Sequence, residues 1–166
     1  MHYRYRSSGF TLIELLVTLV VLAIVVTVAV PSFQDIIRNN RVSTETNSFV
    51  SALQLARSEA VKQGAEVSLT ANVVNQGFAS GYCVHVGGAG VNCNNANRIR
   101  QFDPLNSSLS STTTQLTFNG MGELVANASI TVNVAPPDCP SGKEGGMQQV
   151  TIGLGGQIIV SREECL

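Results

Sequence analysis

Close to its start the chain has 21 consecutive residues, 10–30, of which only Glu14 is ionisable. At about 1.5 Å per residue, a helix of this length measures roughly 32 Å, which is enough to cross a hydrocarbon core of about 30 Å. A lone carboxylate in such a segment costs about 2.5–3.5 kcal/mol on insertion scales. The sequence therefore predicts a single membrane-spanning helix whose Glu14 has a partner on another molecule.

The chemistry of the preceding residues suggests that partner. If the chain is cut after Gly9, a free amine appears on Phe10, four residues before Glu14. Positions four apart lie on one face of a helix. A neighbouring helix shifted along the axis then places its amine against the carboxylate, which neutralises both charges and sets the register between subunits. The simpler alternative is a membrane anchor whose Glu14 is protonated near the interface.

These residues resemble the type IV prepilin signature, which has a short basic leader, Gly9, the run Phe-Thr-Leu-Ile-Glu at 10–14 and then an apolar helix. The resemblance implies cleavage between Gly9 and Phe10 by a prepilin peptidase on the cytoplasmic side and N-methylation of Phe10. It also implies assembly into a helical filament through packed N-terminal helices. Glu14 matches the acidic assembly residue of the family, and Pro31 matches its helix-bending proline.

An ordinary secretory signal peptide is the competing interpretation, with Arg4 and Arg6 as its basic region. Against it, the apolar run is long and contains an acid, and Thr-Val-Ala at 27–29 is a poor cleavage site. Charge does not orient the segment, because two arginines flank it on each side. The resemblance therefore places the leader in the cytoplasm.

The apolar spacing continues after Pro31, with hydrophobic residues three and four apart as far as Val61. Pro31 is expected to bend the helix, because it removes one hydrogen bond and crowds the preceding turn. Lys62-Gln63-Gly64 is a typical helix end. The sequence thus predicts a leader (1–9), a membrane or filament-core helix (10–30), an amphipathic half of the same helix (31–63) and a β-rich periplasmic or extracellular domain (64–166).

After Gly64 the pattern changes to short β-strands separated by Gly, Asn and Pro clusters. The glycine-containing segments 119–122 and 153–156 are predicted to be hairpin turns. Polar loops are expected around 87–97 and 104–113. The predicted strands cover residues 65–71, 81–86, 99–102, 115–119, 123–126, 130–134, 148–152 and 157–161.

All four cysteines follow the apolar run, in what would be an oxidising compartment. Three pairings are possible. Cys83–Cys93 and Cys139–Cys165 are favoured, since each closes a local loop, and each would contribute about 3 kcal/mol. A metal site is the alternative, but there is no Cys-x-x-Cys and His85 is the only nearby histidine, so no metal is predicted.

The run Ala-Leu-Gln-Leu-Ala-Arg-Ser-Glu-Ala-Val at 52–61, followed by Gly64, resembles the GspH/FimT family of minor pilins and pseudopilins. The turn segment 116–122 and a late hairpin ending at Cys165 add to the resemblance. It implies an α+β, type IV pilin-like fold with a long bent N-terminal helix (about 10–63) packed on an antiparallel β-sheet domain. Arg57 and the nearby Glu59 are expected on a solvated helix face or in a local ion pair.

Three functions are compatible with this resemblance. The first is a minor type IV pilin in a tip or priming complex, supporting pilus assembly, adhesion and twitching. The second is a pseudopilin of a type II secretion system, and the third is a minor pilin for DNA uptake. The implied partners are other pilins, the prepilin peptidase and an inner-membrane assembly platform. The implied location is the inner membrane, with the C-terminal domain in the periplasm, and then the pilus at the cell surface.

DNA is disfavoured as a partner. The Gly-Arg-x-Arg element of DNA-binding members falls on Gly-Gln-Ile-Ile at 156–159, which has no arginine. The nearby Arg162 is followed by two glutamates, and Arg98 and Arg100 are expected on an exposed strand face. Without the two leader arginines, eight basic residues stand against eleven acidic ones, a net charge of about −3 that does not attract nucleic acid.

Catalysis is also disfavoured. Of the two histidines, His2 lies in the leader and only His85 remains in the predicted domain. No nucleophile motif, paired-carboxylate arrangement or phosphate-binding loop is present. We therefore predict a structural protein with no catalytic residues and no cofactor.

Overall fold

The structure, a computed structural model, describes residues 9–73, 76–88, 90, 93, 96–105, 107–111, 113–139, 141–142 and 145–165. The side chains of Val28, Pro31, Ser32 and Ser108 lie outside this description, and so do residues 1–8 of the expected leader. The chain divides into two compact units, Met1–Arg38 and Asn39–Leu166.

One long helix, α1 (Leu12–Gln63), runs through both units. Thr11 caps its start, because its Oγ1 accepts a hydrogen bond from the Glu14 amide at 3.3 Å. Gly64 ends it with a φ of 62°, which glycine adopts without strain, and the Ala65 amide donates back to the Ala60 carbonyl at 3.3 Å. The backbone at Pro31 remains helical, and the bend expected there stays a prediction.

In the first unit, the large apolar side chains of α1 that the structure describes are exposed, from Leu12 to Ile37. In the part of the chain that the structure describes, which omits the three side chains at 28, 31 and 32, no helix is long and apolar enough to cross a membrane.

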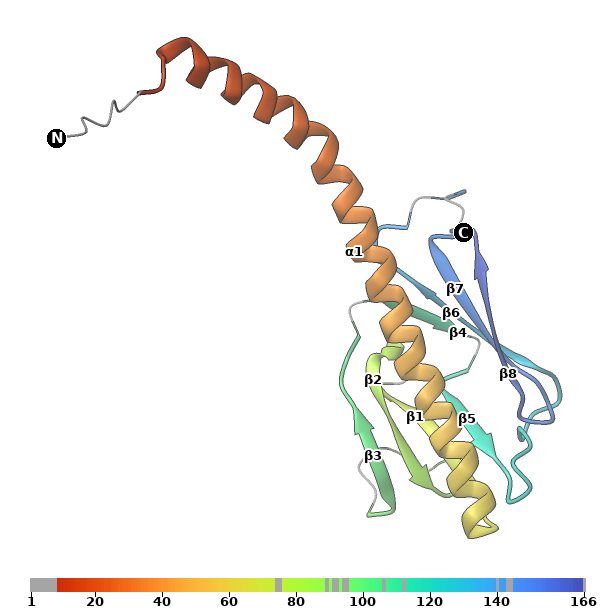
Figure 1. The fold of residues 1–166 in the computed structure, drawn as a ribbon. Coiled ribbons are helices and arrows are strands. Elements are labelled where there is room, and N and C mark those ends of the chain that lie inside the picture. Colours follow the sequence, from red (N-terminus) through yellow and green to blue (C-terminus); the bar gives the residue numbers. More distant parts are fainter. Residues whose placement is uncertain are drawn as a thin grey trace, which may run out of the picture. The chain divides into compact units, whose positions relative to one another are not determined.

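The second unit combines the C-terminal part of α1 with two antiparallel four-stranded sheets (Figure 1). The first sheet has the order β3-β2-β1-β5 and the second the order β4-β6-β7-β8. The strands are β1 (Val67–Val73), β2 (Gly77–Val86), β3 (Arg98–Phe102), β4 (Ser108–Ser111), β5 (Gln115–Phe118), β6 (Ile130–Ala135), β7 (Met147–Ile152) and β8 (Ile158–Glu163).

The core of this unit forms where one face of α1 meets the inner faces of both sheets. The helix buries Phe49 and Leu53 together with three alanines, Ala52, Ala56 and Ala60, at four-residue spacing. Small residues in one line let the helix backbone approach the strands closely. Phe49 packs edge-on against Tyr82 of β2, with ring centroids 5.4 Å apart. The helix is therefore an integral part of the core, and the α+β class of the sequence prediction is confirmed.

Two details of the strand prediction are wrong. Residues 123–126 do not form a strand: Leu124 makes an isolated bridge to Phe118, and its amide donates to the Leu154 carbonyl. Conversely, the expected loop 104–113 contains β4, a strand with one apolar side chain, Leu109. A strand this short and polar has no alternating pattern, so its position depends on tertiary contacts.

Candidate assembly site

The Glu14 carboxylate has no hydrogen-bond or ion-pair partner among the described residues, and its side chain is exposed. The Thr11-x-x-Glu14 order is that of a capping box, in which a glutamate can also bond the amide of the capping residue. Here only the Thr11 half of that box is formed. The Thr11 cap therefore leaves the Glu14 carboxylate without a partner among the described residues.

Gly9 and Phe10 precede the helix, and no heavy atom lies within 4 Å of a Cβ built on Gly9. The Phe10 side chain is 84% exposed. Within the described part of the chain, both residues of the predicted cleavage site are thus exposed. Together with Glu14 and the exposed apolar side chains of α1, they form what we call the assembly site: Gly9, Phe10, Glu14 and the apolar run 12–27.

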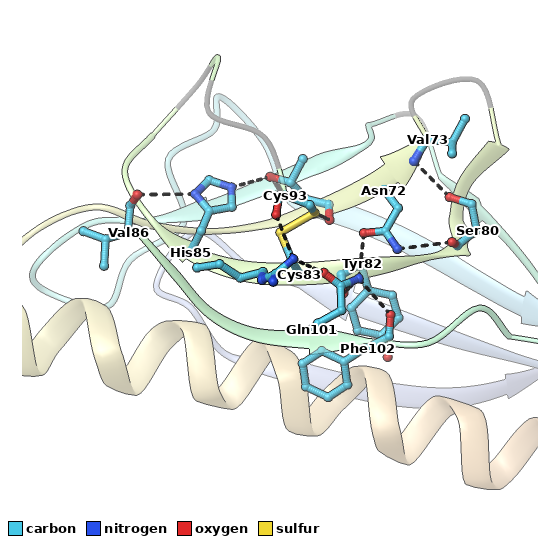
Figure 2. The surroundings of a disulfide bond; sticks show 12 residues. Asn72, Val73, Ser80, Tyr82, Cys83, His85, Val86, Cys93, Gln101 and Phe102 are labelled. Carbon is cyan, nitrogen blue, oxygen red and sulfur yellow. Dashed lines mark hydrogen bonds between the residues drawn. A yellow bond between two sulfur atoms is a disulfide. The ribbon is translucent and has the colours of Figure 1, made fainter. Parts of the chain in front are cut away.

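Two disulfides brace the second unit, joining Cys83 to Cys93 and Cys139 to Cys165. These are the pairs favoured from the sequence. The first ties β2 to the segment that follows Val86, on the side of the first sheet that carries polar residues (Figure 2). The second joins the end of β8 to the segment after β6.

His85, the one histidine of the predicted domain, lies next to the Cys83–Cys93 disulfide (Figure 2) and is fully buried. Its Nε2 lies 2.9 Å from the Thr70 hydroxyl, and its Nδ1 lies 3.4 Å from the Val86 carbonyl oxygen. Burial lowers the pKa of His85 below its usual value, while the bond to the Val86 carbonyl acts in the opposite direction. The ring therefore helps to support the sheet in its neutral form.

This burial makes stability depend on pH. Because the pKa of His85 is lowered in the folded chain, the unfolded chain protonates this residue more fully as the pH falls below about 6.5. The unfolded state then binds more protons, so the free energy of unfolding falls with decreasing pH, by at most about 1.4 kcal/mol per pH unit for one group.

His85→Gln should reduce the difference in the free energy of unfolding between pH 6.5 and pH 5, measured by urea titrations followed by tyrosine fluorescence. The leaderless chain is suited to this probe, since Tyr82 is its single tyrosine and it has no tryptophan. Equal pH slopes in both proteins would contradict the assignment.

Arg57 is half-buried and forms no ion pair among the described residues, and it makes two backbone contacts that were not expected from the sequence. Its Nε donates to the Gly122 carbonyl at 2.9 Å and its Nη2 to the Gly155 carbonyl at 3.0 Å. A Cβ on Gly156, whose φ is 74°, would collide with the Gly122 carbonyl oxygen and lie 2.8 Å from Arg57 Nε. One helix side chain thus ties together the two glycine turns predicted at 119–122 and 153–156. Sequence spacing does not reveal this contact, because its partners are backbone carbonyls.

Glu59 forms a local ion pair, which is one of the two alternatives expected from the sequence. Its carboxylate accepts from Lys62 Nζ at 3.3 Å, an i,i+3 ion pair on the exposed side of the helix. Gln63 donates to its other oxygen at 3.0 Å. The pKa of Glu59 is lowered, first by the Gln63 hydrogen bond and then by Lys62.

Replacing Arg57 should therefore destabilise the second unit. Arg57→Ala leaves two carbonyls without a charged donor, and we expect a loss of about 1–3 kcal/mol in the free energy of unfolding. Arg57→Lys should recover only part of it, because an ammonium group lacks the planar fork that reaches both oxygens. Lys62→Ala, on the same helix, is the matched control and should cost less than about 1 kcal/mol. Urea titration of the full chain in detergent micelles measures the free energy of unfolding of all three variants. Equal losses for Arg57→Ala and Lys62→Ala would refute the stabilising role of the two Arg57 hydrogen bonds.

The positions compared with the DNA-binding element lie at the β7–β8 turn and the start of β8. Gly156 is buried in the turn, Ile158 begins the strand and Ile159 is exposed. Arg98 and Arg100 are exposed on β3, as expected, and Arg100 lies over the Phe102 ring, with its guanidinium carbon 5.0 Å from the ring centroid. Among the described residues, no three His, Cys, Asp or Glu side chains gather closely enough to hold a metal ion.

Comparison with known proteins gives two family matches. Residues 45–156 match the family described as type II transport protein GspH, and residues 4–30 match the prokaryotic N-terminal methylation motif. Two curated fimbrial proteins of Pseudomonas aeruginosa are each 33% identical over 76 residues, 46% of this chain and 49% of the relative. The chain thus spans about half the length of the curated relatives it matches.

Among solved structures, the type IV minor pilin FimU of Pseudomonas aeruginosa is similar in two crystal forms. One is 24% identical with a TM-score of 0.63, covering 74% of this chain and 89% of FimU. The other is 26% identical with a TM-score of 0.57, covering 72% and 90%. The minor pseudopilin EpsH of the Vibrio cholerae type 2 secretion system is 18% identical with a TM-score of 0.48, covering 74% and 97%, a likeness too weak to carry an argument.

Proposed function

The chain belongs to the GspH family, and from this premise we propose that it is a minor type IV pilin, a low-abundance subunit of a tip or priming complex. In that role it supports pilus assembly and, through the pilus, adhesion and twitching. The observation that carries the proposal is the likeness to the minor pilin FimU over 72% of the chain at 26% identity. The partial match to two fimbrial proteins supports it.

The assembly site supplies the physical basis. Residues 4–30 match a methylation motif, and the large apolar side chains from Leu12 to Ile37 are exposed in the described structure. Leaving so much apolar surface in water is unfavourable, at roughly 25 cal/mol per Å². We propose that the inner membrane covers this surface before assembly and the helices of neighbouring pilins cover it afterwards. The prepilin peptidase and an inner-membrane assembly platform are the further proposed partners.

A second candidate function is a pseudopilin of a type II secretion system. The specific observation in its favour is the family match itself, since that family is described as a type II transport protein. Both functions use the same assembly site, so the location of the mature chain separates them.

The N-terminal peptide of the mature chain tests the proposal. We expect mass spectrometry of filaments sheared from the native host to find, at low stoichiometry, a peptide that begins at methylated Phe10. Gly9→Leu should keep the leader, because a branched side chain then occupies the residue before the cleaved bond. The same peptide confined to washed envelopes would favour the pseudopilin. A mature start near Val30 would overturn both functions.

Glu14→Ala tests the role of the free carboxylate. The variant should be produced and cleaved normally but incorporated poorly, because the amine of a neighbouring Phe10 loses its counter-charge. Thr18→Ala is the matched control: it removes a polar group one turn further along, whose hydroxyl donates to the Leu15 carbonyl, and it should be incorporated normally. Immunoblots of sheared filaments against whole cells measure this. Equal incorporation of wild type and Glu14→Ala would reject the charge pairing.

A further inference from the structure

Strand β8 forms one edge of the second sheet, after β4, β6 and β7. All six of its residues pair with β7 without a register shift. Figure 1 shows it as the outermost strand on that side, and no described strand pairs with its other side.

The hydrogen-bond pattern identifies which backbone groups face outward. The Gly153 amide donates to the Gln157 carbonyl at 2.9 Å, which makes these two residues a hydrogen-bonded pair. Bonded and non-bonded pairs alternate along an antiparallel ladder. It follows that the amides of Ile159, Ser161 and Glu163 point to β7, while those of Ile158, Val160 and Arg162 point away from it.

The charges of this edge strand are confined to its last two residues, Arg162 and Glu163; residues 158–161 have no charge and no proline, and the six-residue strand has no bulge. Ile158-Ile159-Val160 are three consecutive apolar residues, with Ile159 59% and Val160 46% exposed on opposite faces. The edge strands β3, β4 and β5 differ. β3 carries Arg98 and Arg100 and pairs through a register shift, and the other two have four residues each.

Both ends of β8 are anchored. At its start, Arg57 bonds the Gly155 carbonyl, and the Leu124 amide bonds the Leu154 carbonyl at 2.8 Å. At its end, Cys165 is joined to Cys139, and its carbonyl accepts from the Gly142 amide. A strand held at both ends loses little conformational freedom when another strand binds to it.

The side chains of β8 indicate which kind of strand could pair with its open edge. Ile158, Val160 and Arg162 point to the inner face of the sheet, where Arg162 lines a hollow of about 40 Å³ with Asn39, Ser43 and Gln148. On the outer face lie Ile159 and the acidic Glu163. Residues opposite each other on paired strands share a face, and opposite charges there are favourable. The matching strand has β-branched residues facing 158–160, an acid facing Arg162 and a base facing Glu163.

We propose that β8 binds an extended segment of a neighbouring filament subunit, which adds to the second sheet as a fifth strand. Backbone bonds to Ile158, Val160 and Arg162 provide the attachment, and the hollow beside Arg162 selects an acidic side chain. This inference rests on the proposed function, since the partner belongs to the same filament.

Hydrogen exchange measured by mass spectrometry with residue-level fragmentation tests this contact. We compare the full chain alone in detergent micelles with the chain in sheared filaments. The amides of Ile158, Val160 and Arg162 should exchange at least about tenfold more slowly in filaments. Those of Ile159, Ser161 and Glu163 are the internal reference and should be slow in both samples.

Val160→Pro provides an independent test. It removes one outward amide and no bond to β7, a position where edge strands tolerate proline. Val160→Thr is the matched control, because it keeps both the amide and the β-branched shape. We expect Val160→Pro to be several-fold depleted from filaments and Val160→Thr to be retained, with Tyr82 fluorescence showing that both variants fold. If Val160→Pro does not fold, the hydrogen-exchange comparison of the wild-type chain in micelles and in filaments still tests whether a strand binds to β8.

The outcomes separate this inference from the proposed function. A chain present in filaments whose outward amides exchange as in micelles refutes strand addition and leaves the proposed function standing. A chain absent from filaments refutes both. Protection in micelles that rises with protein concentration identifies a second copy as the occupant, which also overturns the proposal.

Discussion

Burial of one face of α1 against two sheets is the contact on which the rest of the second unit depends. Phe49, Leu53 and the line Ala52, Ala56 and Ala60 are all fully buried there, and strands from both sheets complete the core. Neither sheet could bury its inner face without this helix, because a single amphipathic layer is not stable in water. For the same reason, the part of α1 that follows Arg38 is an integral element of the second unit.

Arg57 extends this dependence beyond the core. Its guanidinium bonds the Gly122 and Gly155 carbonyls, which belong to the turn after β5 and the turn between β7 and β8. A helix side chain thereby positions the start of β8, while the Cys139–Cys165 disulfide positions its end. The second-unit part of α1 and the disulfide therefore hold the two ends of the edge strand that we propose as a partner site.

Two buried polar side chains of the second unit, His85 and Glu45, form hydrogen bonds. His85 is paired with Thr70 and the Val86 carbonyl beside a disulfide, and the Glu45 carboxylate accepts from the Ser107 amide at 2.9 Å, just before β4. Both contacts bring together residues far apart in sequence or on different strands. They add specificity to the arrangement, and the neutral His85 makes the folded state sensitive to acid.

The sequence by itself determined the features that depend on local order. The apolar run with one acid, the helix end at Lys62-Gln63-Gly64, the turn at 153–156 and the alternation of most strands are all encoded by residues close together in the chain. Only the tertiary structure decided the division into two sheets, the short strand β4, the burial of His85 and the reach of Arg57 to two carbonyls. The physical reason is that these features join distant segments through backbone groups or single polar side chains, which produce no periodic pattern in the sequence.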